Sequence, residues 1–241
     1  MQTIFFTNGD SIIRALDPPR GVTALVGGGG KTTLMLRLAR ALSSGGARVI
    51  VTTTTHIFPP GDIRTLTHAT EDEIDAALTD DRLVCLGTPA EQGKLSAPEL
   101  RFARMAKLAD YVLVEADGAK RLPLKAPAKH EPVIPPETKL VIALAGLDGA
   151  GQPISQAAFR PERYAALCGK QEGDRVTARD IARVLGHSEG QRKGVLDGMR
   201  YVVVLNKADD DERKKIALEI ASELKNDPVE RAVIAALGEE R

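Results

Sequence analysis

The sequence predicts an α/β fold: a mostly parallel, doubly wound sheet of the P-loop NTPase-like kind, with a small helical insertion. Short runs rich in valine and isoleucine alternate with stretches of helical character, which is typical of βαβ units around a parallel sheet. A glycine-rich loop lies between the first strong run and an amphipathic helix. We expect a single nucleotide-binding domain over residues 1–241, with a proline-rich loop at 122–136 and a helical insertion at about 147–198.

The positions of the elements follow from the apolar runs and the residues that break them. Strands are expected at Val22–Val26, Arg48–Thr53, Leu83–Leu86, Tyr111–Glu115, Leu140–Ala145, Tyr201–Leu205 and Ala232–Ala235. Helices are expected at Lys31–Ser43, Glu71–Leu78, Ala97–Leu108 and Asp210–Leu224, with shorter ones in the insertion at Arg160–Leu167 and Thr177–Leu185. In the first helix, leucines at four-residue spacing predict one buried stripe.

The composition limits the classes of partner. Lysine plus arginine number 33, and so do aspartate plus glutamate, so no global field favours nucleic acid or a membrane surface. Tryptophan is absent, which disfavours base-stacking platforms for single-stranded nucleic acid. Two cysteines are typical of a reducing compartment, and no apolar run approaches a membrane-spanning length. We therefore expect a cytoplasmic protein with no nucleic-acid or membrane partner.

The glycine-rich loop predicts a phosphate site. Its glycines let backbone N–H groups turn toward an anion at the positive end of the following helix. A lysine adds positive charge, and the first threonine after it can offer its hydroxyl to Mg²⁺ bound to a nucleotide. The expected nucleotide-binding residues here are Gly27, Gly28, Gly29, Gly30, Lys31, Thr32 and Thr33.

This loop departs from the strict P-loop pattern at one position. That pattern needs a glycine five residues before Gly30, where this chain has Leu25. The chain instead has the shortened form Gly-x-x-Gly-Lys-Thr-Thr, which is also seen in the ATP-binding loops of Mur-type peptide ligases. The sequence therefore predicts a nucleoside triphosphate and leaves ATP and GTP both open.

A second motif predicts the acid that works with this loop. The apolar strand Tyr111–Glu115 is followed by Ala-Asp-Gly, which presents two acids, Glu115 and Asp117, at the phosphate end of a parallel sheet. Either acid could bind Mg²⁺ through water or orient an attacking water. The expected catalytic residues are therefore Lys31, Glu115 and Asp117, with Thr32 and the two acids on Mg²⁺.

A third motif predicts how the base is recognised. The strand ending at Leu205 continues as Asn206-Lys207-Ala208-Asp209, the Asn-Lys-x-Asp pattern of GTPases. A carboxylate can accept both N1–H and the N2 amino group of guanine, a pairing that adenine does not offer. We expect Asn206, Lys207 and Asp209 to bind the nucleotide, with a simple helix start as the alternative.

A second substrate could be held by polar residues near the same edge. Thr54, Thr55 and His56 follow a strand that opens beside the glycine loop, and their side chains can contact a phosphate or an acceptor. The proline-stiffened loop after Asp117 adds cationic and imidazole groups suited to an anion, namely Lys120, Arg121, Lys125 and His130. The Cys/His spacing of a structural zinc site does not occur.

Six segments together resemble the YqeC family, whose members are regarded as accessory proteins of selenium-dependent molybdenum hydroxylases. They are Val26–Thr33, Thr52–His56, Glu115–Lys120, Lys125–Pro127, His130–Pro132 and Asn206–Asp209. The resemblance implies nucleotide binding by the glycine loop. It also implies a role in making or inserting the labile selenium-containing cofactor of these hydroxylases, with a hydroxylase or its cofactor-loading proteins as partner.

Three functions are compatible with these motifs. The first is a Mg²⁺-dependent NTPase or GTPase that acts as a maturation factor, using GTP or ATP. The second is a Mur-ligase-like ATP-dependent ligase, or a phosphoryl or nucleotidyl transferase, acting on a small anionic substrate. The third is a non-catalytic nucleotide-sensing module. It is less favoured, because the two acids Glu115 and Asp117 stand at the end of the strand that begins at Tyr111.

Overall fold

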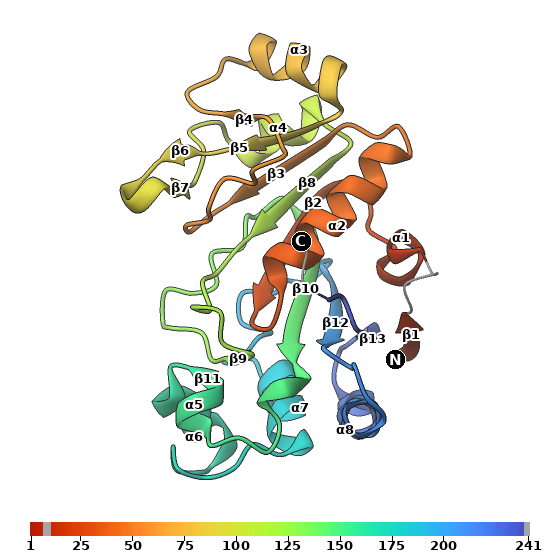
Figure 1. The fold of residues 1–241 in the computed structure, drawn as a ribbon, viewed down its shortest axis with the longest axis vertical. Coiled ribbons are helices and arrows are strands. Elements are labelled where there is room, and N and C mark those ends of the chain that lie inside the picture. The colour runs from red at the N-terminus through yellow and green to blue at the C-terminus, as the bar shows by residue number, and fades with distance from the viewer. Residues whose placement is uncertain (7–10, 239–241) are drawn as a thin grey trace.

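The protein folds as a doubly wound α/β domain around one nine-stranded sheet (Figure 1). The computed structural model describes residues 1–6 and 11–238. The strand order is β1-β13-β12-β10-β2-β8-β3-β5-β4, and every neighbouring pair in this sheet is parallel. Because all strands run the same way, their carboxyl ends meet at one edge, where ligands bind in open α/β sheets.

The strands of the main sheet are β1 (Gln2–Phe6), β2 (Gly21–Gly27), β3 (Val49–Thr53), β4 (Thr65–Leu66), β5 (Leu83–Leu86), β8 (Tyr111–Glu115), β10 (Thr138–Gly146), β12 (Arg200–Asn206) and β13 (Arg231–Ala235). Two small sheets pair β6 (Thr88–Pro89) with β7 (Leu95–Ser96) and β9 (Leu124–Lys125) with β11 (Ala158–Phe159). The helices are α1 (Ile12–Leu16), α2 (Lys31–Ser44), α3 (Glu71–Asp81), α4 (Phe102–Leu108), α5 (Ile154–Ala157), α6 (Pro161–Cys168), α7 (Ala178–Gly186) and α8 (Asp211–Glu223).

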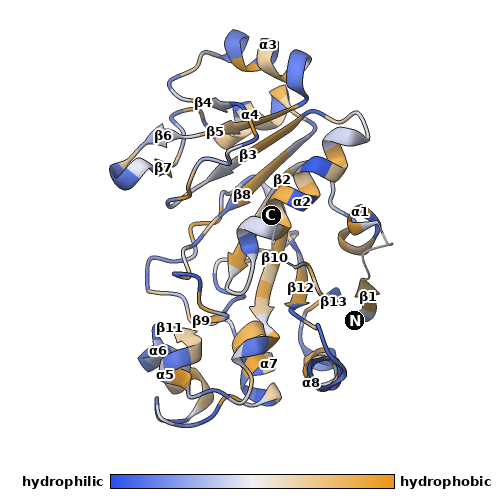
Figure 2. Ribbon diagram, viewed as in Figure 1, coloured by the Kyte–Doolittle hydropathy of each residue, from blue (hydrophilic) through white to orange (hydrophobic). Residues whose placement is uncertain are grey.

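Helices cover both faces of the sheet, because its central strands carry apolar side chains on both faces. On β2, Leu25 packs with α1 and α2, whereas Val22 packs with α3 and α4, and Val26 packs with α7 and α8. The central strands are hydrophobic along their length, and α3 and α8 carry hydrophilic outer residues (Figure 2). Burial on both faces explains why these strands read as continuous apolar runs.

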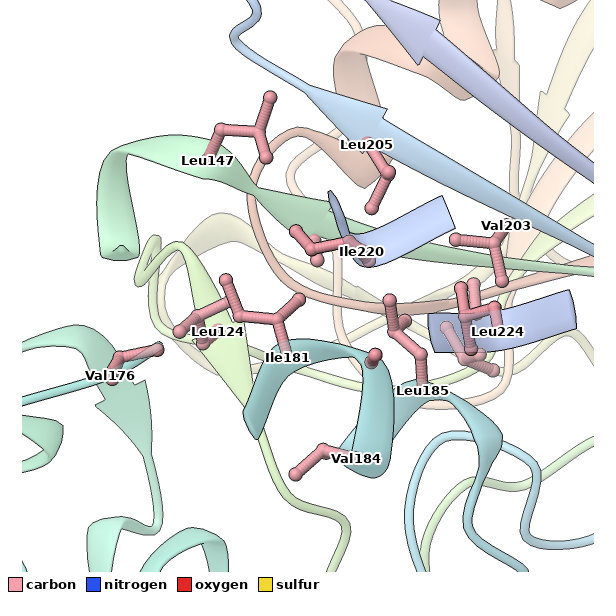
Figure 3. Packing of buried hydrophobic residues seen from close by; sticks show 14 of the residues in the cluster. Leu124, Leu147, Val176, Ile181, Val184, Leu185, Val203, Leu205, Ile220 and Leu224 are labelled. Carbon is pink, nitrogen blue, oxygen red and sulfur yellow. The ribbon is translucent and has the colours of Figure 1, made fainter. Parts of the chain in front are cut away.

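The segment between β10 and β12 supplies α5, α6 and α7. Ile181 and Leu185 of α7 point toward α8 and the strands β10 and β12, whereas Val184 points to the other side of α7 (Figure 3). Thr177 caps α7 by accepting the Asp180 N–H, and the Asp180 carboxylate accepts the Thr177 N–H in return. The segment is thereby fixed beside the carboxyl edge of the sheet, where α7 lies below β10 in the view of Figure 1.

The expected strands are present, with ends that differ by up to two residues. The helix expected at Ala97–Leu108 begins only at Phe102. Pro98 and the extended Arg101 explain the difference, and the Ala97 carbonyl accepts the Thr88 hydroxyl of the β6–β7 hairpin instead of starting a helix. Among the described residues, no helix is long and apolar enough to cross a membrane.

Candidate functional site

The glycine loop is a tight turn between β2 and α2 that only glycine can make. Gly27 and Gly29 have φ values of 96° and 78°, in the left-handed region. A Cβ on Gly27 would lie 2.3 Å from the Leu144 carbonyl oxygen, and one on Gly29 would lie 2.3 Å from the Gly146 nitrogen. Close backbone packing against the end of β10 therefore requires glycine at both positions.

The backbone N–H groups of this turn donate hydrogen bonds to other groups of the protein. Gly27 donates to Asp117 at 3.1 Å, Gly28 to the Leu144 carbonyl at 3.1 Å, and Gly29 to the Leu122 carbonyl at 3.1 Å. The first turn of α2 is different, because its N-cap is Gly30, which has no side chain that could accept a hydrogen bond from the helix N–H groups. The first N–H groups of a helix have no partner within the helix. The start of α2 is therefore the part of this turn with N–H groups suited to an anion.

Lys31 lies in the first turn of α2 and turns back into the loop. Its ammonium group donates to the Gly27 carbonyl at 2.5 Å and lies 3.2 Å from Asp117 and 3.9 Å from Glu115. Burial alone would lower the pKa of Lys31, but the charges of Asp117 and Glu115 outweigh it and raise the pKa above the usual value. Lys31 is therefore a buried cation at the phosphate end of the sheet.

Thr32 and Glu115 meet across the mouth of the loop. The Thr32 hydroxyl donates to the Glu115 carboxylate at 2.7 Å, although the two residues are 83 positions apart. Burial raises the pKa of Glu115 above its usual value, although the nearby Lys31 charge opposes this rise. A hydroxyl and a carboxylate are oxygen ligands of the kind Mg²⁺ takes beside substrate phosphates. These two residues therefore fit a nucleotide-bound Mg²⁺ better than Asp117 does.

Asp117 has a different environment from Glu115. Its side chain is fully buried, and both carboxylate oxygens face the Gly27 N–H. Lys31 lies 3.2 Å from one oxygen, and Lys125 lies 3.0 Å from the other. The structure thus places Asp117 as a buried anion that holds two lysines and the glycine loop.

Lys125 is also fully buried, which sequence reasoning did not indicate. Its ammonium group lies 2.8 Å from Glu131 and donates to the Gly118 carbonyl at 2.6 Å. Glu131 in turn accepts two hydrogen bonds from Arg160, at 2.6 and 3.0 Å. The role of Glu131 and Arg160 was missed because 29 residues separate them, and no local spacing signals a pair of this kind.

Phe159 lies beside these charges. The Arg160 guanidinium is 4.3 Å from the centre of the Phe159 ring, and the ammonium groups of Lys120 and Lys125 are 5.3 and 5.7 Å from it. Lys120 and Arg121 are exposed and both adopt left-handed backbone conformations, with φ values of 48° and 63°. Among the described residues, Arg121 has no ion pair.

Asn206 is buried between the glycine loop and the end of β13. Its amide nitrogen donates to the Gly29 carbonyl at 2.7 Å, and its amide oxygen accepts the Leu237 N–H at 3.0 Å. Both ends of the side chain are thus used to join two loops. The structure therefore places Asn206 beside the phosphate loop as a positioning residue.

Lys207 and Asp209 lie further out than Asn206. Lys207 donates to Asp148 at 2.6 Å, and Asp209 accepts from Arg213 at 3.0 Å. The Asp209 side chain is 51% exposed. Asp209 is therefore open to a base, whereas Lys207 is held against the loop that follows β10.

The remaining second-substrate candidates lie on the exits of β3 and β8. The Thr54 hydroxyl donates to the Val133 carbonyl at 2.8 Å, and the Thr55 N–H donates to the Thr53 hydroxyl at 2.9 Å. His56 and His130 are exposed. The structure brings the glycine loop, Glu115, Asp117 and Lys125 into contact with one another, and it leaves the two histidines on the surface.

Comparisons with known proteins agree with this arrangement of motifs. A family model described as YqeC protein matches residues 23–162, which is more than half of the chain and includes the glycine loop, Glu115 and Glu131. A protein of Escherichia coli (strain K12) named "Uncharacterized protein YqeC" is 33% identical over 160 residues. That alignment covers 64% of this chain and 62% of the relative, so less than two thirds of its length is matched. The chain therefore belongs to the YqeC family.

Proposed function

We propose that this protein is a Mg²⁺-dependent, nucleoside-triphosphate-binding accessory factor that hydrolyses GTP or ATP. The observation that carries the proposal is the 2.7 Å contact between Thr32 and Glu115 at the start of α2, beside the buried Lys31. Thr32 and Glu115 offer two oxygen ligands for the metal. Lys31 and the N-terminus of α2 offer positive charge for the phosphates, so together they have the chemistry needed to hold a metal–phosphate group.

Each residue has a part in the proposed reaction. Lys31 would contact the phosphates, and Thr32 and Glu115 would organise Mg²⁺ and the attacking water. Asp117 would hold Lys31 and the glycine loop in place. Asp209 would accept the N1–H and N2 amino group of guanine, which favours GTP over ATP.

The test is nucleotide-dependent thermal stabilisation, since a ligand that binds the native state raises its melting temperature. We expect Mg²⁺ with GTP or ATP to stabilise the wild type and to have little effect on Lys31→Ala. Lys107→Ala, which changes an exposed lysine of α4, is the matched control and should respond like wild type. If no nucleotide stabilises the wild type, or if Lys31→Ala responds equally, the proposal is wrong.

We further propose that the nucleotide is used in maturing the selenium-containing cofactor of a molybdenum hydroxylase, because the chain belongs to the YqeC family. The test is hydroxylase activity in cells that lack this protein and receive either the wild type or Lys31→Ala. Restoration by the wild type alone would support the role. Equal hydroxylase activity with and without the protein would contradict it.

A ligase or transferase is the second candidate, and the exposed cations Lys120 and Arg121 favour it. They directly precede Leu122, whose carbonyl accepts the Gly29 N–H of the glycine loop, so an anionic acceptor could lie next to the phosphates. Acceptor-dependent release of ADP, or of AMP and pyrophosphate, would support this reading. Release of nucleoside diphosphate and phosphate without any acceptor would favour hydrolysis.

A further inference from the structure

An unbroken row of alternating charges runs from the glycine loop to the surface beside α6. The row is Lys31, Asp117, Lys125, Glu131 and Arg160, here called the charge row. Its successive closest contacts are 3.2, 3.0, 2.8 and 2.6 Å. No residue of the row is next to another in the sequence, so only the fold brings them into line.

The charge row is most deeply buried in its middle, since the Lys31 side chain at the loop end is 4% exposed. The side chains of Asp117 and Lys125 are 0% exposed, that of Glu131 is 10% exposed, and that of Arg160 is 20% exposed. Buried charges interact strongly because water does not screen them, and removing one partner leaves the other uncompensated. The position of each charge in the row therefore depends on the next.

Lys31 is the member of the row that a nucleotide would move. In the structure its ammonium group is held by the Gly27 carbonyl and Asp117. A lysine that follows a glycine loop reaches the β- and γ-phosphates when a triphosphate binds. Lys31 would then turn away from Asp117, which would leave Lys125 as the nearest cation to this fully buried carboxylate.

The outer end of the charge row is Arg160, whose surroundings at the surface can be observed by experiment. Lys125 already contacts both Asp117 and Glu131, so a stronger pull from Asp117 would weaken its contact with Glu131 and leave Glu131 more dependent on Arg160. The Arg160 guanidinium also stacks 4.3 Å from the Phe159 ring, so a change at Glu131 alters this stacking. We propose that the charge row transmits the nucleotide state of the glycine loop to the surface at Phe159 and Arg160.

This inference rests on the proposed function, because it needs a triphosphate at the glycine loop. Coupling between two sites is reciprocal, so a change at Arg160 must also change nucleotide affinity. We expect Arg160→Met, which keeps the length of the stem and removes the charge, to change the Kd of Mg²⁺–GTP or Mg²⁺–ATP on the order of fivefold. Arg163→Met, in the first turn of α6, which Arg160 precedes as N-cap, is the control for an arginine outside the row.

The chain contains no tryptophan, so a single tryptophan at position 159 reports on this surface alone. Phe159→Trp keeps an aromatic face for Arg160 and Lys120. Phe58→Trp is the matched control, because Phe58 also carries a cation, Lys94, at 5.3 Å from its ring but has no link to the charge row. Fluorescence of each variant is recorded with Mg²⁺–GTP and Mg²⁺–ATP, and binding is measured separately by calorimetry.

We expect the emission of Phe159→Trp to change on nucleotide binding and that of Phe58→Trp to stay constant. Adding Glu131→Gln or Arg160→Met to Phe159→Trp should abolish the emission change while calorimetry still detects binding. Nucleotide binding without any emission change at position 159, or the same change after the row is broken by either substitution, overturns the inference. If calorimetry detects no binding to the wild type, the proposed function itself fails, and the inference fails with it.

Discussion

The Asn206 side-chain amide donates to the Gly29 carbonyl at 2.7 Å, although Asn206 lies 177 positions further along the chain. The same side chain accepts the Leu237 N–H, so one amide joins the glycine loop to the loop after β13. We expect Asn206→Ala to lower the free energy of unfolding by about 2–4 kcal/mol, because it leaves two buried polar groups without a partner. Urea unfolding measures this change.

The matched control for Asn206 is Asn226→Ala. Asn226 is exposed, and its replacement should change stability by less than about 0.5 kcal/mol. If the two variants unfold at the same urea concentration, the two hydrogen bonds of Asn206 do not contribute as the structure indicates.

The second prediction concerns acid stability and Glu131. Burial alone would raise the pKa of Glu131, but hydrogen bonds from Arg160 and Lys125 outweigh it and lower the pKa to about 2 from 4.5. Because the folded-state pKa is depressed, the carboxylate stabilises the fold above pH 4.5, and this stability is lost as the pH falls toward about 2. Melting temperatures between pH 6 and pH 2 should therefore fall less steeply for Glu131→Gln than for wild type. Parallel curves for the two proteins would contradict the ion pairs of Glu131.

The third prediction concerns Mg²⁺. Thr32→Val removes the hydroxyl that donates to Glu115, whereas Thr32→Ser keeps it. We expect Thr32→Val to weaken nucleotide binding mainly when Mg²⁺ is present, and Thr32→Ser to bind like wild type. Calorimetric titrations with Mg²⁺ and with EDTA separate the two effects. An equal loss for the valine variant under both conditions would show that the hydroxyl does not act through the metal.

The fourth prediction concerns the base. Asp209 is paired with Arg213, but its side chain is half exposed. Its carboxylate is therefore accessible to a ligand. We expect Asp209→Asn to weaken GTP binding at least about tenfold, since a charged hydrogen-bond acceptor is lost, and to leave ATP binding nearly unchanged. Asp211→Asn, which changes an exposed acid in the first turn of α8, serves as the control. Equal weakening of both nucleotides by Asp209→Asn would rule out guanine recognition by this residue.

The fifth prediction concerns a small cavity behind Lys125. It has a volume of about 10 Å³ and is lined by Tyr164 and Gln191, whose buried hydroxyl and amide oxygen have no hydrogen-bond partner within residues 1–6 and 11–238. Such a space holds about one water, which can accept from the tyrosine and donate to the amide oxygen. A high-resolution crystal structure should show this water in the wild type.

Tyr164→Phe should remove that water and lower stability by about 1 kcal/mol. Its matched control is Tyr201→Phe, because the Tyr201 hydroxyl donates directly to the Leu185 carbonyl at 2.8 Å and involves no water. A dry cavity in the wild type, or a direct bond between Tyr164 and Gln191, would contradict the prediction.

Much of the fold could be predicted because its signals are local. The apolar runs of β2, β8, β10 and β12 are buried on both faces, and such runs read clearly as strands. The glycine loop was recognisable because glycine, lysine and threonine stand at fixed spacing. The strand β1 and the helix α1 were missed, since both have only five residues and one face of each is exposed.

The site was only partly predictable, because its electrostatics depend on long-range contacts. Lys125 appeared to be one more cation of an exposed loop, yet it is fully buried against Asp117 and Glu131. The two acids at the carboxyl end of β8, Glu115 and Asp117, could not be distinguished by sequence. The fold distinguishes them, since Glu115 faces Thr32 whereas Asp117 faces two lysines.

The pairing of β1 with β13 has a consequence for synthesis on the ribosome. Residues 2–6 pair with residues 231–235, so β1 cannot take its place in the sheet until β13 has been made. Asn206 likewise contacts Gly29 only after β12 has been made, and the Leu237 N–H that holds Asn206 comes later still. A nascent chain therefore carries a glycine loop without its Asn206 brace until β12 and the residues after β13 have been made.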